Sequence, residues 1–209
     1  LISNEYYETL ARPNVDVVTD NIAEVTATGI RTKDGQEHPV DAIIYGTGFQ
    51  ATDFLAPMKI TGRGGVDLNQ VWRDGAEAYL GMTVSGFPNL FLLYGPNTNL
   101  GHNSIVYMLE SQFSYILDAV KTLQQRDLRF VDVRSQVQGV YNRWVQKQIK
   151  NTIWDAGCTS WYKTASGKNT NNWPGFTLVY RYKTRHFDTQ DYELAVKSAR
   201  ILPLQVAAA

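Results

Sequence analysis

Residues 41–49, DAIIYGTGF, constrain the fold of this chain more than any other stretch. Residues 42–45 are apolar without alternation, a pattern typical of a strand that is buried on both faces of a parallel or mixed sheet. Gly46 and Gly48 follow at once, and glycine lets the backbone turn sharply or lets a flat ligand lie against it. We therefore expect the end of a central strand here, at the sheet edge where α/β proteins hold their ligands. The alternative is a permissive turn that binds nothing.

A second stretch repeats this order of apolar run and glycine turn. Residues 90–93 are apolar, and YGPNTNLGHNS follows at residues 94–104. Residues 104–126 then predict a helix capped by Asn103 or Ser104, because apolar residues recur at helical spacing. The stripe expected to face the core comprises Ile105, Leu109, Phe113, Ile116, Val120 and Leu123. The positive N-terminal end of such a helix would stabilise an anion held in the glycine loop, although most capped helices bind nothing.

The remaining patterns predict short strands, further helices and long loops. We expect helices at residues 4–10, 68–72 and 135–150, and strands at residues 15–19, 22–26, 29–32, 37–40, 79–84, 90–94 and 128–133. The Asp34-Gly35 pair predicts a hairpin with a type I′ turn. Periodicity does not decide whether residues 176–185 form a strand or a helix. Trp161 and Trp173 lie in polar loops, where they either contact a ligand or plug the surface of the core.

Composition excludes several classes of protein. The 209 residues include 20 Lys+Arg and 20 Asp+Glu, and this neutral balance argues against a nucleic-acid partner. A single cysteine, Cys158, excludes an internal disulfide and suits a reducing compartment, so we expect a cytoplasmic protein. No window holds the roughly 18 consecutive apolar residues that a membrane span needs. The chain begins at Leu1 rather than at methionine, and we interpret it as an internal cut of a longer protein.

No familiar catalytic set is visible in the sequence. The three histidines have no metal-ligand spacing, so no metal site is expected, and Ser160 lies in no G-x-S-x-G turn. The pyrophosphate-binding turn G-x-G-x-x-G is also missing. The residues themselves therefore indicate part of an α/β ligand-binding protein and nothing more specific.

Several motifs, taken in order, resemble the carboxyl-terminal half of class B flavoprotein monooxygenases, most closely the Baeyer-Villiger type. They are DAIIYGTGF at residues 41–49, GRGG at 62–65, AYLG at 78–81, GFPNLF at 86–91, YGPNTNLGHNS at 94–104 and CTSWY at 158–162. The first, extended by Val40 to residues 40–49, matches the family's "ATG" segment, with Gly46 in place of the common alanine. Together with the Gly167-Lys168 pair, CTSWY matches the family's mobile loop.

The resemblance implies an α/β fold that is the carboxyl-terminal portion of a flavoprotein with two dinucleotide-binding domains. Its parts would be incomplete Rossmann-like sheets, helices and a long C-terminal loop region. Residues 1–49 would end the NADPH-binding domain, with a β-hairpin and the ATG-type strand. Residues 50–126 would form the carboxyl-terminal part of the FAD-binding domain, and residues 127–209 would hold the C-terminal helix and the loop that closes over cofactor and substrate.

The same resemblance implies an oxidoreductase that uses FAD, NADPH and O2. Through a peroxyflavin, such enzymes convert a ketone to an ester or lactone, or oxygenate a soft heteroatom, so the implied partner is a small ketone or heteroatom substrate. Oxygenation of nitrogen or sulfur is the alternative to Baeyer-Villiger chemistry. The residues implied to contact the cofactors are Thr47, Gly48 and Phe49 on the FAD side, Asn97, Asn103 and Ile105 near the isoalloxazine, and Trp161 at NADP⁺ or substrate.

No catalytic residue is expected within this chain. In the family, both glycine-rich phosphate turns and the arginine that holds the peroxyflavin precede the part that matches here. We therefore expect the 209-residue chain alone to bind FAD weakly or not at all, and to be inactive. An alternative of another class is a binding or assembly module that self-associates through exposed sheet edges.

Overall fold

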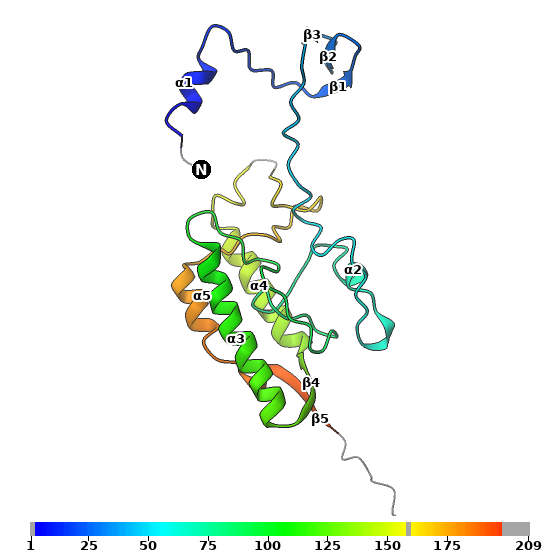
Figure 1. The fold of residues 1–209 in the computed structure, drawn as a ribbon, viewed down its shortest axis with the longest axis vertical. Helices are drawn as coiled ribbons and strands as arrows, with labels where there is room; N and C mark the ends of the chain where they lie inside the picture. Colours follow the sequence, from blue (N-terminus) through cyan, green and yellow to red (C-terminus); the bar gives the residue numbers. More distant parts are fainter. Residues whose placement is uncertain (1–2, 158–159, 198–209) are drawn as a thin grey trace, which may run out of the picture. The chain divides into compact units, whose positions relative to one another are not determined.

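The computed structural model describes residues 3–157 and 160–197, and the chain divides into two compact units, Leu1–Gly48 and Phe49–Ala209 (Figure 1). Its composition of elements is mixed, with helices and strands in both units. Both sheets formed by the described strands are antiparallel.

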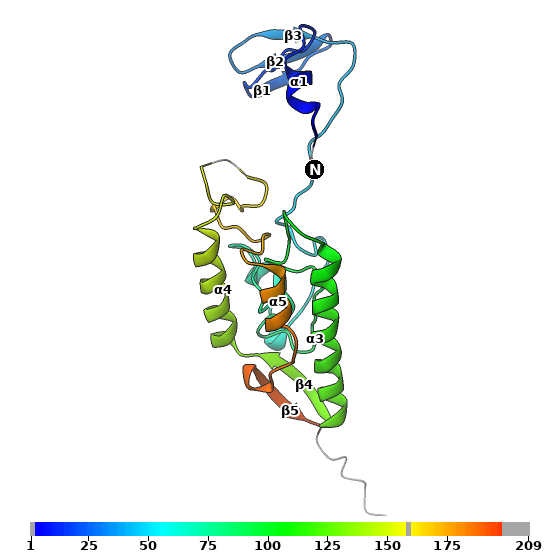
Figure 2. The same cartoon turned by 90° about the vertical axis from the view of Figure 1, so that its left-hand side faces the viewer.

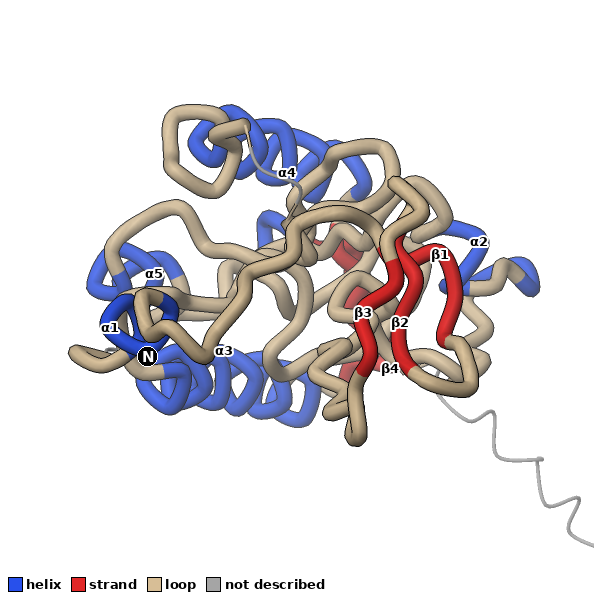
Figure 3. The backbone as a smooth tube through the Cα atoms, turned by 90° about the horizontal axis from the view of Figure 1, so that it is seen from above, coloured by secondary structure: helices blue, strands red, loops and turns tan. Residues whose placement is uncertain are grey.

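The first unit holds a short helix and a three-stranded sheet. Helix α1 spans Tyr6–Leu10, and the strands are β1 (Ile22–Val25), β2 (Gly29–Thr32) and β3 (Glu37–Pro39), in the order β1-β2-β3 (Figure 3). The predicted hairpin is confirmed, but the predicted type I′ turn is wrong. Thr32 N–H donates to Gln36 O at 3.0 Å, and Gly35 is the one turn residue with a positive φ, of 89°. This is a three-residue loop, in which a glycine alone takes the left-handed position.

Two strands predicted for this part of the chain are not formed. Residues 15–19 and 41–49 form no helix or strand and pair with no described strand. Ile44 is 96% exposed and Phe49 is 90% exposed, so the interpretation of a buried central strand is wrong. The physical reason is that a lone strand has no neighbour to satisfy its backbone groups or to cover its apolar side chains.

The second unit combines helices with a two-stranded sheet. Its helices are α2 (Leu68–Val71), α3 (Ile105–Gln125), α4 (Ser135–Ile149) and α5 (Thr177–Lys183), with short 3₁₀ turns η1 (Arg63–Gly65) and η2 (Thr189–Asp191). Strands β4 (Leu128–Val133) and β5 (Tyr192–Val196) pair antiparallel. Helices α3, α4 and α5 run alongside one another, with the β4–β5 sheet at one end of them (Figure 2). The predicted helices at residues 104–126 and 135–150 and the strand at residues 128–133 are confirmed, whereas β5 was not predicted.

Helix α3 buries a different face from the predicted one. Its buried side chains are Met108, Ser111, Gln112, Tyr115 and Ala119. Of the predicted stripe, Phe113 is 48% exposed, Val120 is exposed, and the other members are only half-buried. The prediction of the stripe is therefore wrong in part. The reason is that α3 carries apolar residues around much of its circumference, and the packing of α5 and β4 against it decides which of them are covered.

Residues 79–84 are largely buried and residues 90–94 are partly exposed, and neither run forms the predicted strand. Tyr79 and Thr83 make an isolated bridge around a tight turn, in which Leu80 and Gly81 have φ of 53° and 69°. The apolar residues of these two runs pack against the core and do not belong to strands. A short apolar run in a sequence does not distinguish a strand from another packed segment.

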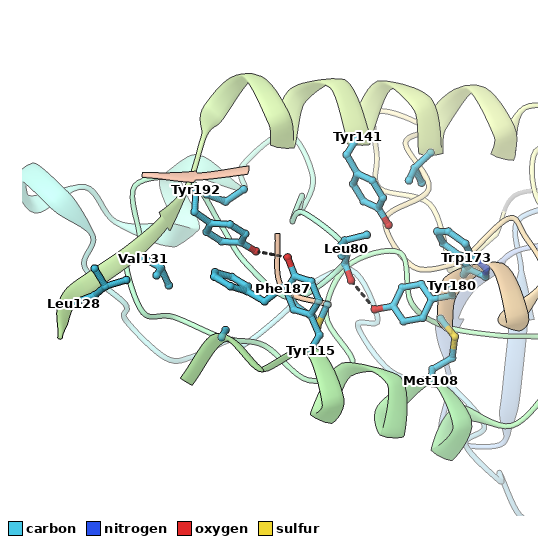
Figure 4. Close-up of a cluster of buried hydrophobic side chains, with 14 of the residues drawn as sticks. Leu80, Met108, Tyr115, Leu128, Val131, Tyr141, Trp173, Tyr180, Phe187 and Tyr192 are labelled. Atoms are coloured by element: carbon cyan, nitrogen blue, oxygen red, sulfur yellow. Dashed lines mark hydrogen bonds between the residues drawn. The ribbon is translucent and has the colours of Figure 1, made fainter. Parts of the chain in front are cut away.

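The main core lies between α3, α4, α5 and the β4–β5 sheet, and it is rich in tyrosine (Figure 4). The hydroxyls of Tyr115 and Tyr192 are 3.0 Å apart, and the Tyr180 hydroxyl donates to Leu80 O at 2.6 Å. Trp173 is fully buried in this core, so of its two predicted roles it takes the structural one. A second, smaller core comprises Leu68, Trp72, Ala76, Ala78, Val84, Phe87 and Leu92.

Candidate functional site

The glycine-bearing loop of residues 94–104 is held in place by a segment that lies about seventy residues later in the chain. Tyr94 and Asn97 in this loop have φ of 56° and 57°, a conformation that asparagine tolerates better than tyrosine. Backbone bonds then join the loop to residues 170–173. They are Asn97 N–H to Thr170 O (2.8 Å), Asn99 N–H to Asn171 O (2.9 Å) and Trp173 N–H to Asn99 O (2.8 Å).

The buried side chain of Asn97 adds two hydrogen bonds between the loop of residues 94–104 and residues 169–172. It is 1% exposed, and its Nδ2 donates to Asn169 O at 3.0 Å and to Asn172 O at 3.1 Å. Its Oδ1 and the Nδ2 of Asn172 are buried and have no partner among the described residues. Buried amide groups are normally satisfied, so this pair leaves one acceptor and one donor unused at the junction.

The start of α3 lies at the end of the same loop. Asn103 Oδ1 accepts from Ser104 N–H at 2.7 Å, and Asn103 Nδ2 donates to Thr177 Oγ1 at 2.8 Å, at the first turn of α5. Ser104 is the N-cap residue, yet its side chain makes no capping bond. The N–H groups of the first turn, which begins at Ile105, therefore have no side-chain acceptor, and they carry the partial positive charge of the helix.

A row of aromatic rings lies beside the loop. Trp161 is 60% exposed and stacks on Tyr162, with ring centroids 4.3 Å apart. Tyr162 in turn meets Trp154 edge-on at 5.4 Å. A Cβ built on Gly101 would lie 2.4 Å from Trp154, so only glycine allows the loop to approach this ring. The ring of Trp161 is therefore exposed to solvent and packs on Tyr162, which in turn packs on Trp154.

Ion pairs fasten the segment that carries these rings. Lys163 Nζ lies 2.9 Å from Asp155 Oδ1, and Lys168 Nζ lies 2.5 Å from Glu77 Oε1. The Lys163 and Lys168 side chains are well covered, so these pairs are less screened than ordinary surface pairs. Of the motif CTSWY, Cys158 and Thr159 lie outside the described residues.

Tyr94 supplies a neutral hydroxyl at the start of the loop. Its hydroxyl donates to Asn99 Oδ1 at 2.8 Å. Partial burial raises the pKa of Tyr94, with a smaller contribution from the nearby Tyr162. The phenol therefore stays protonated and acts as a hydrogen-bond donor rather than as a base.

The predicted cofactor contacts fall into two groups in the structure. Asn97, Asn103 and Ile105 lie together in the loop of residues 94–104 and the first turn of α3, and Trp161 lies on the segment that is bonded to that loop. The other three contacts, Thr47, Gly48 and Phe49, are exposed and lie outside any described helix or strand. Gly48 has a φ of 72°, and a Cβ built there would meet no atom within 4 Å, so this turn is open to a ligand.

Sequence reasoning missed the residues that hold the loop in place. Asn169 and Asn172 support Asn97, while Trp154 and Tyr162 support Trp161. The signal was present in the run NTNN at residues 169–172, because asparagine side chains favour turns and bond to nearby backbone. Its partner in the loop could not be deduced from the spacing.

Two further properties of the described residues bear on the site. Within residues 3–157 and 160–197, no group of three His, Cys, Asp or Glu side chains is suited to a metal ion. In the same part of the chain, no helix has both the length and the apolar character needed to cross a membrane.

Comparison with known proteins shows extensive similarity to one group. No family model matches the chain. A Baeyer-Villiger monooxygenase from Pseudomonas aeruginosa is 49% identical over 196 residues, which cover 93% of this chain and 37% of that protein. A Baeyer-Villiger monooxygenase from Streptomyces coelicolor is 41% identical over 210 residues, covering 100% of this chain and 40% of that protein. The chain thus spans about two fifths of the length of these curated relatives.

Solved structures extend the similarity to the fold. A cyclohexanone monooxygenase from Rhodococcus sp. Phi1 bound to NADP+ matches with a TM-score of 0.75 and 28% identity, over 93% of this chain and 38% of that one. OTEMO in complex with FAD and NADP matches with a TM-score of 0.79 and 27% identity, over 93% and 37% of the two chains.

Proposed function

Because this chain is related in sequence and fold to one part of the Baeyer-Villiger monooxygenases, we propose that it is a portion of an NADPH- and FAD-dependent monooxygenase. The proposed reaction inserts one oxygen atom of O2 into a ketone and gives an ester or a lactone. The observation that carries the proposal is the 49% identity over 93% of the chain to a Baeyer-Villiger monooxygenase. In this view the chain comprises the end of an NADPH-binding domain, part of an FAD-binding domain with incomplete Rossmann-like sheets, and a closing loop region.

The residues present fit one end of an FAD molecule. The loop of residues 94–104 ends at helix N–H groups without a side-chain cap, and the Asn97–Asn172 pair has unused hydrogen-bonding capacity. We assign Asn97, Asn103 and Ile105 to the isoalloxazine ring, and Thr47, Gly48 and Phe49 to the FAD side of the open turn. No residues here correspond to a glycine-rich pyrophosphate turn, so the fit is confined to the ring end.

Each of these groups has a role that follows from its chemistry. FAD, when bound and reduced by NADPH, supplies the activation of O2. The first turn of α3 would favour negative charge on the pyrimidine edge of the ring, because its N–H groups point along the helix axis. Trp161 would lie against NADP⁺ or substrate through its exposed face, with Tyr162 and Trp154 keeping its orientation.

The proposal is tested on the polypeptide that carries this segment together with its upstream sequence. NADPH consumption and product mass are measured with an aryl ketone, a cyclic ketone and a thioether. An ester or lactone that has gained one oxygen atom is the expected product. A sulfoxide alone, with both ketones untouched, would assign the chain to the heteroatom-oxygenating relatives and overturn the Baeyer-Villiger assignment.

The 209-residue chain alone provides a second test. We expect it to purify without a flavin spectrum, because it has no donor set for the FAD pyrophosphate. FAD added to the chain should bind weakly, and no NADPH should be consumed. Near-stoichiometric FAD in the purified chain would contradict this expectation and would point to a phosphate site not recognised in the sequence.

A further inference from the structure

A groove of about 520 Å³ runs beside α4 in the second unit. Its walls are mainly aromatic and aliphatic, and they include Tyr79, Val137, Val140, Tyr141 and Trp144. Its volume lies within the roughly 300–1,000 Å³ that is usual for small-molecule sites, which are mostly apolar with a few well-placed polar groups. None of these residues belongs to the cofactor contacts assigned above.

The rings of the groove form a supported aromatic surface. Tyr79 and Tyr141 meet edge-on with centroids 5.4 Å apart, and Tyr141 lies 6.0 Å from Trp144 at an interplanar angle of 38°. Trp144 is backed in turn by the buried Trp173, at 5.7 Å. Val140, one helical turn before Trp144 on α4, is 59% exposed. A planar apolar ligand would cover this side chain and gain ring contacts.

The groove is lined by one charge of each sign, Lys183 and Asp191, and the two differ in whether a described residue is bonded to them. Lys183 Nζ lies 5.1 Å from the Trp144 ring centroid, and no described carboxylate pairs with it. The only carboxylate that lines the groove among the described residues, Asp191, is already engaged, because the Tyr79 hydroxyl donates to its Oδ2 at 2.6 Å. Burial and the Asp191 charge raise the pKa of Tyr79, so its hydroxyl remains a donor. The ammonium of Lys183 is therefore the group left for a ligand.

We propose that this groove binds a planar aromatic carboxylate. The ring would lie against Tyr141 and Trp144 over Val140, and the carboxylate would accept hydrogen bonds from the Lys183 ammonium. A cationic ligand is disfavoured by Lys183, and a neutral one leaves that charge unused. The proposal does not depend on the proposed monooxygenase activity, because neither FAD nor NADPH takes part.

Titration calorimetry of the 209-residue chain with 2-naphthoate and with its neutral analogue 2-naphthamide tests the proposal. We expect 2-naphthoate to bind on the order of tenfold more tightly, as one charge-assisted contact would allow. Lys183→Gln should bring the two affinities together, whereas Val140→Gln should weaken both probes. Lys147→Gln, on an exposed lysine of α4 outside this groove, is the matched control and should change neither affinity.

Three results would overturn the proposal. They are no binding of 2-naphthoate, equal binding of the two probes by the unmodified chain, and affinities that Val140→Gln leaves unchanged. Circular dichroism and thermal melting of each variant confirm that it is folded. Since no cofactor is added, none of these results bears on whether the longer polypeptide oxygenates ketones.

Discussion

At the scale of single residues, Gly101 and Gly139 differ in whether their surroundings leave room for a side chain. Gly101 lies against Trp154, where an added Cβ would lie 2.4 Å from the Cη2 atom of the ring. Gly139 lies inside α4, and its nearest neighbour is the flexible tip of Arg143, at 3.3 Å. The first position needs glycine for space, whereas the second has room for a methyl group.

Alanine should therefore have opposite effects at these two positions. Gly101→Ala is expected to lower the free energy of unfolding by about 1–3 kcal/mol, since the ring and the loop must move apart. Gly139→Ala should raise it by roughly 0.5–1 kcal/mol, because alanine loses less backbone entropy in a helix. Urea denaturation of both variants measures the two values. Equal effects of the same sign would contradict the close approach of Gly101 to Trp154.

The buried tyrosines predict how stability depends on alkaline pH. Burial raises the pKa of Tyr192 to about 12 and the pKa of Tyr115 further. In the unfolded chain both ionise near pH 10, so above that pH the unfolded state binds fewer protons and the free energy of unfolding falls. The stabilisation is complete below pH 10 and is lost as the pH rises through the folded-state values.

Tyr115→Phe isolates one of these groups. Between pH 9 and pH 11, the loss of unfolding free energy should be smaller in this variant by about 1 kcal/mol, because one fewer buried phenol ionises on unfolding. Tyr192 keeps a partner in the variant, since its hydroxyl also lies 3.1 Å from Thr83 Oγ1. Identical pH profiles of the two proteins would show that Tyr115 is not buried as described.

At the scale of elements, the two long helices and strands β1 to β4 lie where the sequence predicts them, whereas β5 was missed and four predicted strands do not form. Residues 105–125 and 135–149 carry a local periodicity that needs no distant partner, so both long helices are found where the sequence predicts them. Strands depend on pairing, and neither of the apolar runs at residues 42–45 and 79–84 has a partner strand among the described residues; residues 79–84 make only the isolated Tyr79–Thr83 bridge. The β5 strand was missed because its sequence, YELAV, carries little alternation and pairs with β4, some sixty residues earlier.

Two substitutions in α3 measure which of its faces is covered. Met108→Ala removes a side chain with no exposed surface and should cost about 2–5 kcal/mol of unfolding free energy. Phe113→Ala removes a ring from the stripe predicted by periodicity, but it is half-exposed and should cost much less, about 1 kcal/mol. Chemical denaturation ranks the two. The reverse ranking would restore the predicted face.

At the scale of the whole molecule, the two units differ in how much they bury. Among the described residues, the hydrophobic core residues all lie in the second unit, whereas the strands of the first unit are mostly exposed. The sequence interpretation did not predict this difference in burial, because it assigned a buried central strand to residues 42–45, which lie in the first unit. Within the candidate site, the proximity of Asn97 and Asn103 was predictable, because both lie in one motif. The segment that holds Asn97 was not, because Asn97 and Asn172 are 75 positions apart.

Limited proteolysis tests this division. Chymotrypsin is expected to cut first after Tyr45 or Phe49, because both side chains are exposed and lie outside any described helix or strand. The resistant product should begin within residues 46–50 and contain the elements from α2 to β5. Mass spectrometry of the digest identifies its first residue. A first cut after Trp161 would show instead that the aromatic row is less well held than the extended stretch.

The bonds between Asn97, Asn99 and residues 169–173 have a consequence for the order of events during synthesis. A ribosome makes the loop of residues 94–104 well before the asparagine run that holds it. Until that run has left the exit tunnel, Asn97 lacks the partners that keep it in its left-handed conformation. The start of α3 can form early, whereas the loop before it acquires its final shape only when the last fifth of the chain has emerged.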